Sequence, residues 1–375
     1  MHNPASPSQA STMAFAGQKQ SSRTGLFVKS FAAQSLLAVN VMVLLTFYLI
    51  FYPNQTPLKV LILISGLIAT TLAAFLGGLF LLSFYQVARH QKPKSAFVAI
   101  LKQSWQTISE PRRAALGMPF LVILMVFMYV FVQIKNNIPL MVPYFWDEPL
   151  HNFDVWMHFG KAPWEWLHPF FSQSPYLVFA LNVNYNLWFF TMWMVIIPFA
   201  FSSTNSIIRT QFFLAFFLIW ATGGSALATY FSSVGPAFYA KLGLSPDPYA
   251  GLMTYLGQVN QIIPVWAYEL QNEMWLAYKG GGINIGISAM PSMHNATALL
   301  FVLSARHLSK KMVIPLAVHC FLIYIGSIYL AWHYAVDAYL GWLVTIVAWW
   351  VSAPIARWWH NRPSVVEFTR QLDMT

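Results

Sequence analysis

Long hydrophobic runs alternate with short polar stretches along almost the whole chain. A helix needs about 20 mostly apolar residues to cross a hydrocarbon core of about 30 Å. By this measure the pattern predicts eight membrane-spanning helices, at positions 31–52, 58–86, 118–134, 176–202, 206–231, 293–309, 312–331 and 335–356. Each run is bounded by Pro, Gly, charged or aromatic residues. The sequence therefore predicts an all-α, polytopic integral membrane protein.

The composition excludes several other classes of protein. Of the 375 residues, 58% are hydrophobic and 9% are charged, whereas about 25% are charged in an average soluble domain. A water-soluble globule and a disordered chain are both incompatible with these values. The single cysteine, Cys320, lies inside an apolar run, so no intramolecular disulfide and no cysteine-rich metal site can form.

The basic residues indicate how the chain is oriented. They gather in loops that fall on one side of the predicted helices: Arg89, Lys92, Lys94, Lys102, Arg112, Arg113, Lys310, Lys311, Arg357, Arg362 and Arg370. Cytoplasmic loops carry an excess of Lys and Arg, so this side and both termini are expected in the cytoplasm. The net charge of +10 is explained by membrane topology and anionic lipids, and a nucleic-acid partner is not expected.

The same reasoning divides the chain into four parts. We expect a cytoplasmic tail over 1–30, two additional helices with a basic loop over 31–117, a six-helix catalytic domain over 118–357, and a second tail over 358–375. The two long loops, at about 135–175 and 232–292, then face the non-cytoplasmic side of a cell inner membrane or an equivalent membrane.

Three ionisable residues at the mouths of the predicted helices are candidates for catalysis. His294 and His333 each begin a span, and the direction of successive spans brings both to the outer face. Asp337 follows His333 by four residues, which places both on one helix face. The carboxylate can then fix the tautomer of His333 and leave its other nitrogen free to attack. A nucleophile, its orienter and a general acid are the components of covalent phosphoryl transfer.

Other interpretations of these residues stay open at this point. Each histidine can be a hydrogen-bonded packing residue, and the three side chains can be zinc ligands. His151, Asp154 and His158 in the first outer loop allow a metal site as well, although an interfacial helix with its aromatic face at the lipid head groups is preferred.

Two segments around the histidines resemble elements of a known family. Residues 291–294, Pro-Ser-Met-His, are similar to the Pro-Ser-Gly-His element of the type 2 phosphatidic acid phosphatase superfamily, which comprises membrane lipid phosphatases and phosphotransferases. Residues 328–341 resemble its last element, in which a His precedes an Asp by four positions. The resemblance implies that His333 becomes a phosphohistidine, that Asp337 orients it, and that His294 protonates the leaving group. It implies no metal and no cofactor.

The chain also departs from the phosphatases of that family. Their Lys-x6-Arg-Pro element does not occur, and Gly326 and Ser327 occupy the positions of their Ser-Arg pair. A phosphate monoester carries a charge of about −1.5 to −2 and needs several cations, so these losses favour a phosphodiester. The inositol phosphorylceramide synthases, which move phosphoinositol from phosphatidylinositol to ceramide, lack these arginines too. Loop segments 138–164 and 235–239 resemble that branch, although more loosely than the histidine elements do.

The sequence-based expectation is a lipid phosphotransferase with a phospholipid donor and a lipid-alcohol acceptor. Five further residues are expected to bind substrate because they lie near the histidine elements on the outer side: Tyr239, Lys241, Lys279, Ser292 and Asn295. One alternative is a lipid phosphate or polyprenyl pyrophosphate phosphatase. An alternative of another class is a non-catalytic transporter or lipid-binding protein, in which the histidines would be structural.

Overall fold

The computed structural model describes residues 25–51, 57–90, 93–280 and 286–375, and within them the chain forms helices and no strand. The long helices are α2 (Ser35–Phe51), α3 (Pro57–His90), α5 (Pro111–Met141), α8 (Pro175–Ala200), α9 (Ile207–Ala221), α13 (Met293–Leu308), α14 (Val313–Tyr329) and α15 (Ala335–His360). The shorter helices are α4 (Ala96–Ser109), α6 (Asp147–Met157), α7 (Pro163–Phe171), α10 (Ala228–Tyr230), α11 (Ala250–Ile262), α12 (Trp266–Gly280) and α16 (Pro363–Met374).

Within the described residues, each of the eight predicted spans contains a helix, but fewer than eight of these helices meet the length and hydropathy of a membrane span. Five helical segments of the described residues are long and apolar enough to cross a membrane: Pro111–Met141, Pro175–Ala200, Ile207–Tyr230, Lys310–Tyr329 and Ala335–His360. A sixth span results if Gly25–Ala33 and Ser35–Ile50, which meet at a bend of 58°, are counted together. The chain is thus an all-α, polytopic integral membrane protein.

Two predicted spans differ in ways that bear on the site. The third, expected to end at 134, continues as α5 to Met141, because Asn136, Asn137 and Pro139 do not terminate the helix. The sixth, α13, has only 16 residues and is shorter than a bilayer requires. Of the expected N-terminal tail, residues 1–24 lie outside the described residues, whereas residues 358–375 form the end of α15 and α16.

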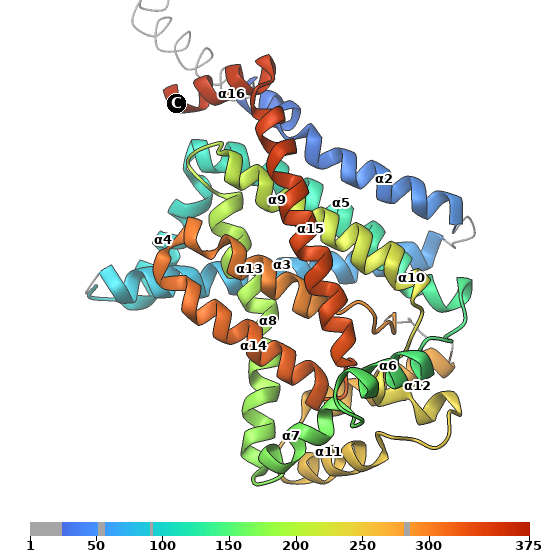
Figure 1. Ribbon diagram of the computed structural model, residues 1–375. Coiled ribbons are helices and arrows are strands. Elements are labelled where there is room, and N and C mark those ends of the chain that lie inside the picture. Colours follow the sequence, from blue (N-terminus) through green and yellow to red (C-terminus); the bar gives the residue numbers. More distant parts are fainter. Residues whose placement is uncertain (1–24, 52–56, 91–92, 281–285) are drawn as a thin grey trace, which may run out of the picture.

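The long helices pack around one apolar core. Helix α9 packs along α15, α13 packs against both α14 and α15, and α3 lies against α8 (Figure 1). Phenylalanines of α9 fill the centre, where Phe213 stacks on Phe120 of α5 with ring centroids 3.8 Å apart. Such close aromatic packing joins α5 to α9, and α9 in turn contacts α13 and α15, the helices next to the two candidate histidines.

Short helices cover one end of this bundle. Helices α6, α7, α11 and α12 come from the two loops predicted to be long, and they lie together at the end where α15 begins (Figure 1). Helix α16 and the C-terminus lie at the opposite end. The two histidine elements belong to the covered end.

Candidate active site

His333 lies in the short connection between α14 and α15, and several hydrogen bonds hold it in place. Its Nδ1 lies 3.2 Å from Oδ2 of Asp337, one turn further on, and Oδ2 also accepts the backbone N–H of Tyr334. The backbone N–H of His333 donates to the carbonyl of Ser327 at 2.9 Å. Asp337 is fully buried. One nitrogen of the imidazole is therefore occupied, and Nε2 is left for chemistry.

The protonation of His333 suits a nucleophile. Burial lowers its pKa to about 3, and the positive charge of Lys135 acts in the same direction, while a contact with the Ala289 backbone acts the other way. The imidazole is consequently neutral at physiological pH. A neutral ring has the free electron pair that attack on phosphorus requires.

His294 is supported differently, because its ring contacts aromatic rings and no hydrogen-bond partner is found for it within the described ranges. It stacks on Tyr185 with centroids 4.7 Å apart, and it lies 4.1 Å from the ring of Trp188. His294 belongs to the first turn of α13, where the helix dipole favours an anion. The two imidazoles are 6.5 Å apart, centroid to centroid, which leaves room for a phosphoryl group between them.

Both histidines line a cavity of about 650 Å³. Its walls are largely aromatic and include Phe131, Tyr185, Trp188, Trp220, Phe238 and Trp332. A cavity of this size accommodates a small-molecule or lipid-sized group, and its apolar walls favour acyl or isoprenoid chains. The polar groups that could define a reaction centre are concentrated at the two histidines.

Lys135 adds a positive charge to this cavity. It is one of the lining residues, it forms no ion pair within the described part of the chain, and its charge acts on both imidazoles. The next residue, Asn136, accepts the backbone N–H of Gly286 at 2.8 Å, which ties this turn of α5 to the segment before α13. Lys135 is thus the cation available to a bound phosphate.

Lys135 was not among the sequence-based candidates. The sequence predicts that the third span ends at 134, one residue before Lys135. Its position could have identified it from the sequence. An ionisable residue at the outer end of a membrane helix, on the side of the histidines, is a functional candidate by default.

The starts of α13 and α15 are in backbone contact. Ser292 donates its N–H to the carbonyl of Asp337 at 3.0 Å. A Cβ placed on Gly341 would come within 2.7 Å of the Ser292 carbonyl oxygen, so only glycine permits this approach. The contact holds the two histidine elements at a fixed separation.

Ser292 and Asn295, two of the expected substrate ligands, are fully buried and do not line the cavity. Ser292 caps α13, since its hydroxyl accepts from the backbone N–H of Asn295. The amide of Asn295 donates to Ser292 Oγ at 3.0 Å and to Ser327 Oγ at 3.1 Å. These contacts join the His294 helix to the end of α14, directly before the His333 connection.

Tyr239, Lys241 and Lys279 are also absent from the cavity lining. The ammonium groups of Lys241 and Lys279 lie 6.0 Å and 5.4 Å from the ring centroid of Trp275, and Trp275 stacks on Phe238, which does line the cavity. Tyr239 is buried beside His151 and Tyr249. The two lysines therefore lie one aromatic layer away from the cavity.

The loop histidines are paired with tyrosines. His151 Nδ1 lies 2.9 Å from the hydroxyl of Tyr249, and His158 Nε2 lies 2.8 Å from that of Tyr339. Among the residues that the structure describes, no three His, Cys, Asp or Glu side chains are grouped to hold a metal ion. Helix α6 and the turn after it also carry three exposed aromatic side chains, Phe153, Trp156 and Phe159.

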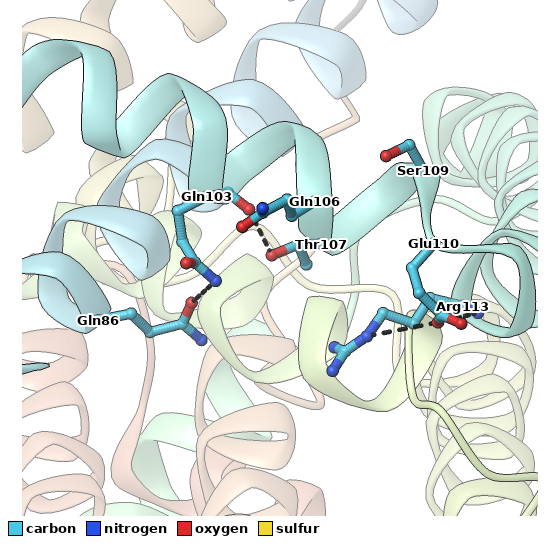
Figure 2. A pocket seen from close by; sticks show the side chains of 7 residues that line it. All are labelled: Gln86, Gln103, Gln106, Thr107, Ser109, Glu110 and Arg113. Atoms are coloured by element: carbon cyan, nitrogen blue, oxygen red, sulfur yellow. Dashed lines mark hydrogen bonds and ion pairs between the residues drawn. The ribbon is translucent and has the colours of Figure 1, made fainter.

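A second hollow of about 720 Å³ has a different character. It lies where α3, α4 and α5 meet, and Figure 2 shows Gln103 reaching toward Gln86 while Arg113 faces Glu110. No histidine or cysteine lines it. It offers hydrogen bonds but no imidazole to activate a nucleophile, so the candidate active site is the cavity that contains His294 and His333.

The fold and this cavity define a membrane protein with paired imidazoles at a lipid-sized, aromatic site. The sequence model of the PAP2 superfamily matches residues 148–351, which is more than half of the chain and includes all three candidate catalytic residues. The chain belongs to the PAP2 superfamily, and its function is of the lipid phosphatase or phosphotransferase type. No curated protein and no solved structure matches the chain.

Proposed function

We propose that the protein is a lipid phosphotransferase that moves a phosphoinositol-like head group from a phospholipid to a lipid alcohol. The observation that carries this proposal is the composition of the cavity, where the described lining residues include two imidazoles, one cation, Lys135, and aromatic walls. The reaction passes through a phosphohistidine and requires no metal.

In the first half of the reaction, Nε2 of His333 attacks the phosphorus of the donor. The bond from phosphorus to the diacylglycerol oxygen breaks, and His294, protonated beside the bound anion, gives its proton to that oxygen. The lipid alcohol leaves, and the head group is joined to His333 through a P–N bond. Asp337 holds the proton on Nδ1 and stabilises the positive charge that develops on the ring.

In the second half, the neutral His294 accepts the proton of the incoming lipid alcohol. The alcohol oxygen attacks phosphorus, the P–N bond breaks, and His333 regains its electron pair. The product carries the head group, and both histidines return to their starting states. If water takes the place of the alcohol, the same steps give hydrolysis.

The charge balance supports a diester donor. Lys135 is the cation that keeps its charge after His294 has given up its proton, and it matches the single negative charge of a phosphodiester, whereas a monoester carries more charge. The aromatic walls support a lipid acceptor, because a site lined by large apolar side chains holds few water molecules that compete for the phosphohistidine.

The remaining sequence-based candidates receive roles that fit their contacts. Ser292 and Asn295 position α13, and with it His294. Lys241 and Lys279 interact with the head group at the edge of the cavity, beside Trp275, and Tyr239 supports that edge. The active site faces the non-cytoplasmic leaflet, and both termini lie in the cytoplasm, as the distribution of basic residues indicates.

Mass spectrometry of lipids tests this proposal directly. Purified protein is incubated in detergent with mixed phospholipids and candidate lipid alcohols, beside a His333→Ala variant. We expect a new lipid that carries a transferred phospho-head group and that the variant does not make. A soluble phosphorylated head group without a new lipid would establish a hydrolase, and no turnover by the wild-type protein would contradict both assignments.

A further inference from the structure

Helix α6 places two acidic side chains next to the His333 connection. Asp147 and Asp154 are seven residues apart, which puts them two turns apart on one face of the helix. Both are 1% exposed, whereas their neighbour Glu148 is exposed. Acidic side chains are rarely this buried unless they are paired, so their partners indicate what they do.

Asp154 binds the first turn of α15. Its Oδ2 accepts the backbone N–H of Ala335 at 3.0 Å, and its Oδ1 accepts that of Val336 at 3.1 Å. These N–H groups follow His333 by two and three residues, and they lack partners inside the helix. A carboxylate from another helix thus caps α15 at the point where the catalytic connection enters it.

Asp147 binds the same connection, one residue closer to His333. Its Oδ1 accepts the hydroxyl of Tyr334 at 2.8 Å and the backbone N–H of Gly235 at 2.8 Å. Gly235 has a φ of 89°, and a Cβ there would come within 2.7 Å of the Trp332 carbonyl oxygen. The segment around Gly235 is therefore pressed against the residue before His333, and Asp147 fixes it there.

The His333 connection needs this support because it is not helical. Residues 330–334 separate α14 from α15, and Asp337 orients the imidazole correctly only while the first turn of α15 keeps its place. Asp154 holds residues 335 and 336, and Asp147 holds residue 334. The backbone on the α15 side of His333 is thus attached to a helix that is distant in sequence.

We infer that Asp147 and Asp154 are positioning residues for the phosphoryl transfer, acting through the backbone and Tyr334 to keep His333 aligned with Asp337. The inference rests on the proposed function, since it assigns roles within that reaction. It differs from a purely structural role in one respect: weakening the contact changes the orientation of His333 more than it changes the stability of the fold.

The experiment compares Asp154→Ala, Asp154→Asn and Asp147→Asn with Glu148→Gln as the matched control on the same helix. For Asp154→Ala we expect kcat per folded protein to fall about 10–100-fold, as for the loss of a charge-assisted contact, with KM changed less than about 2-fold. Asp154→Asn retains one acceptor oxygen and nearly the same volume, so it should recover part of kcat. Asp147→Asn should lower kcat, and Glu148→Gln should leave it unchanged.

Nitrogen-15 NMR of labelled histidine gives a readout that does not depend on turnover. The His333 signal, assigned by its loss in His333→Ala, should show the Nδ1–H tautomer in the wild-type protein and a mixture of tautomers in Asp154→Ala. Where that variant does not fold, Asp154→Asn and Asp147→Asn provide the comparison.

Two outcomes would overturn the inference. One is an unchanged tautomer and kcat in the folded Asp154 and Asp147 variants. The other is a loss of activity that follows only the fraction of unfolded protein. If the wild-type protein transfers no phosphoryl group, the proposed function fails, whereas the NMR comparison still shows whether α6 orients His333.

Discussion

His333 and His294 face the same cavity but are held in opposite ways. Hydrogen bonds to Asp337 and to the Ser327 carbonyl fix His333 and leave it one free nitrogen. His294 is held by the aromatic faces of Tyr185 and Trp188. A ring fixed by hydrogen bonds keeps one tautomer, whereas a ring held by stacking can gain and lose a proton without breaking a polar contact. The difference matches a nucleophile in one position and a general acid and base in the other.

The largest expected effect is that of removing the nucleophile. His333→Ala should lower transfer about 10³-fold or more, because it removes the side chain proposed to form the covalent intermediate. Phosphorus-labelled donor lipid, quenched in alkali, should leave label on the wild-type protein and none on the variant. His319→Ala, which removes a half-buried histidine bonded to Asn184, is the matched control. Label on the His333→Ala protein would show that the nucleophile is another residue.

Removing the other histidine should separate the two halves of the reaction. His294→Ala should slow turnover of natural lipids about 10²–10⁴-fold, the usual contribution of general acid–base catalysis. A donor with a nitrophenol leaving group needs no proton, so it should form the phosphohistidine at nearly the normal rate. The intermediate should then accumulate, because no base activates the acceptor. Equal loss with both donors would contradict the assignment of His294 as the acid.

Lys135 should influence binding more than chemistry. Lys135→Met keeps the length of the side chain and removes its charge, and a charge-assisted hydrogen bond contributes about 1.5–3 kcal/mol. We therefore expect KM for the donor to rise about 10–100-fold, with a smaller change in kcat. Lys161→Met, at an outer-loop lysine that lies over Trp166, should leave KM unchanged. An unchanged KM in Lys135→Met would contradict the assignment of Lys135 as the cation that binds the phosphate.

The smallest effect concerns pH. Because burial and Lys135 lower the pKa of His333 to about 3, the wild-type kcat/KM should show no acid limb near pH 6.5. In Lys135→Met the lowering by that charge is lost, so the pKa of His333 rises and an acid limb moves upward into the measurable range. A profile of kcat/KM between pH 4 and 8 for both proteins checks the direction. An acid limb near pH 6.5 in the wild-type protein would show that burial does not control His333.

Patterns among residues close together in the chain were sufficient to predict the long helices and the pairing of His333 with Asp337. Apolar runs located every long helix, since a bilayer imposes its thickness on the sequence. The i, i+4 spacing of His333 and Asp337 corresponds to the hydrogen bond between them. Both inferences depend on residues close together in the chain.

The sequence did not predict contacts between residues that are far apart in the chain. Lys135 was missed because α5 continues past the predicted boundary, and no local signal indicates that it shares a cavity with residues about 160–200 positions later. The partners of Asp154 in α15 are backbone N–H groups, which carry no side-chain identity and leave no trace in the pattern. Asn295 was expected beside the substrate, but its bond to Ser327 depends on the packing of α13 on α14, which the sequence does not show.

The close backbone approach at Gly341 distinguishes the residues that set the spacing of the histidines from the wall residues that can be exchanged. The distance between the histidines is set where two backbones touch, at Gly341 and Ser292, and not by the aromatic walls of the cavity. Wall residues can therefore be exchanged to admit a different lipid while the spacing of the catalytic pair stays the same. Such a division makes the scaffold suitable for redesign, in which donor and acceptor preference is altered on the walls and the reaction itself is retained.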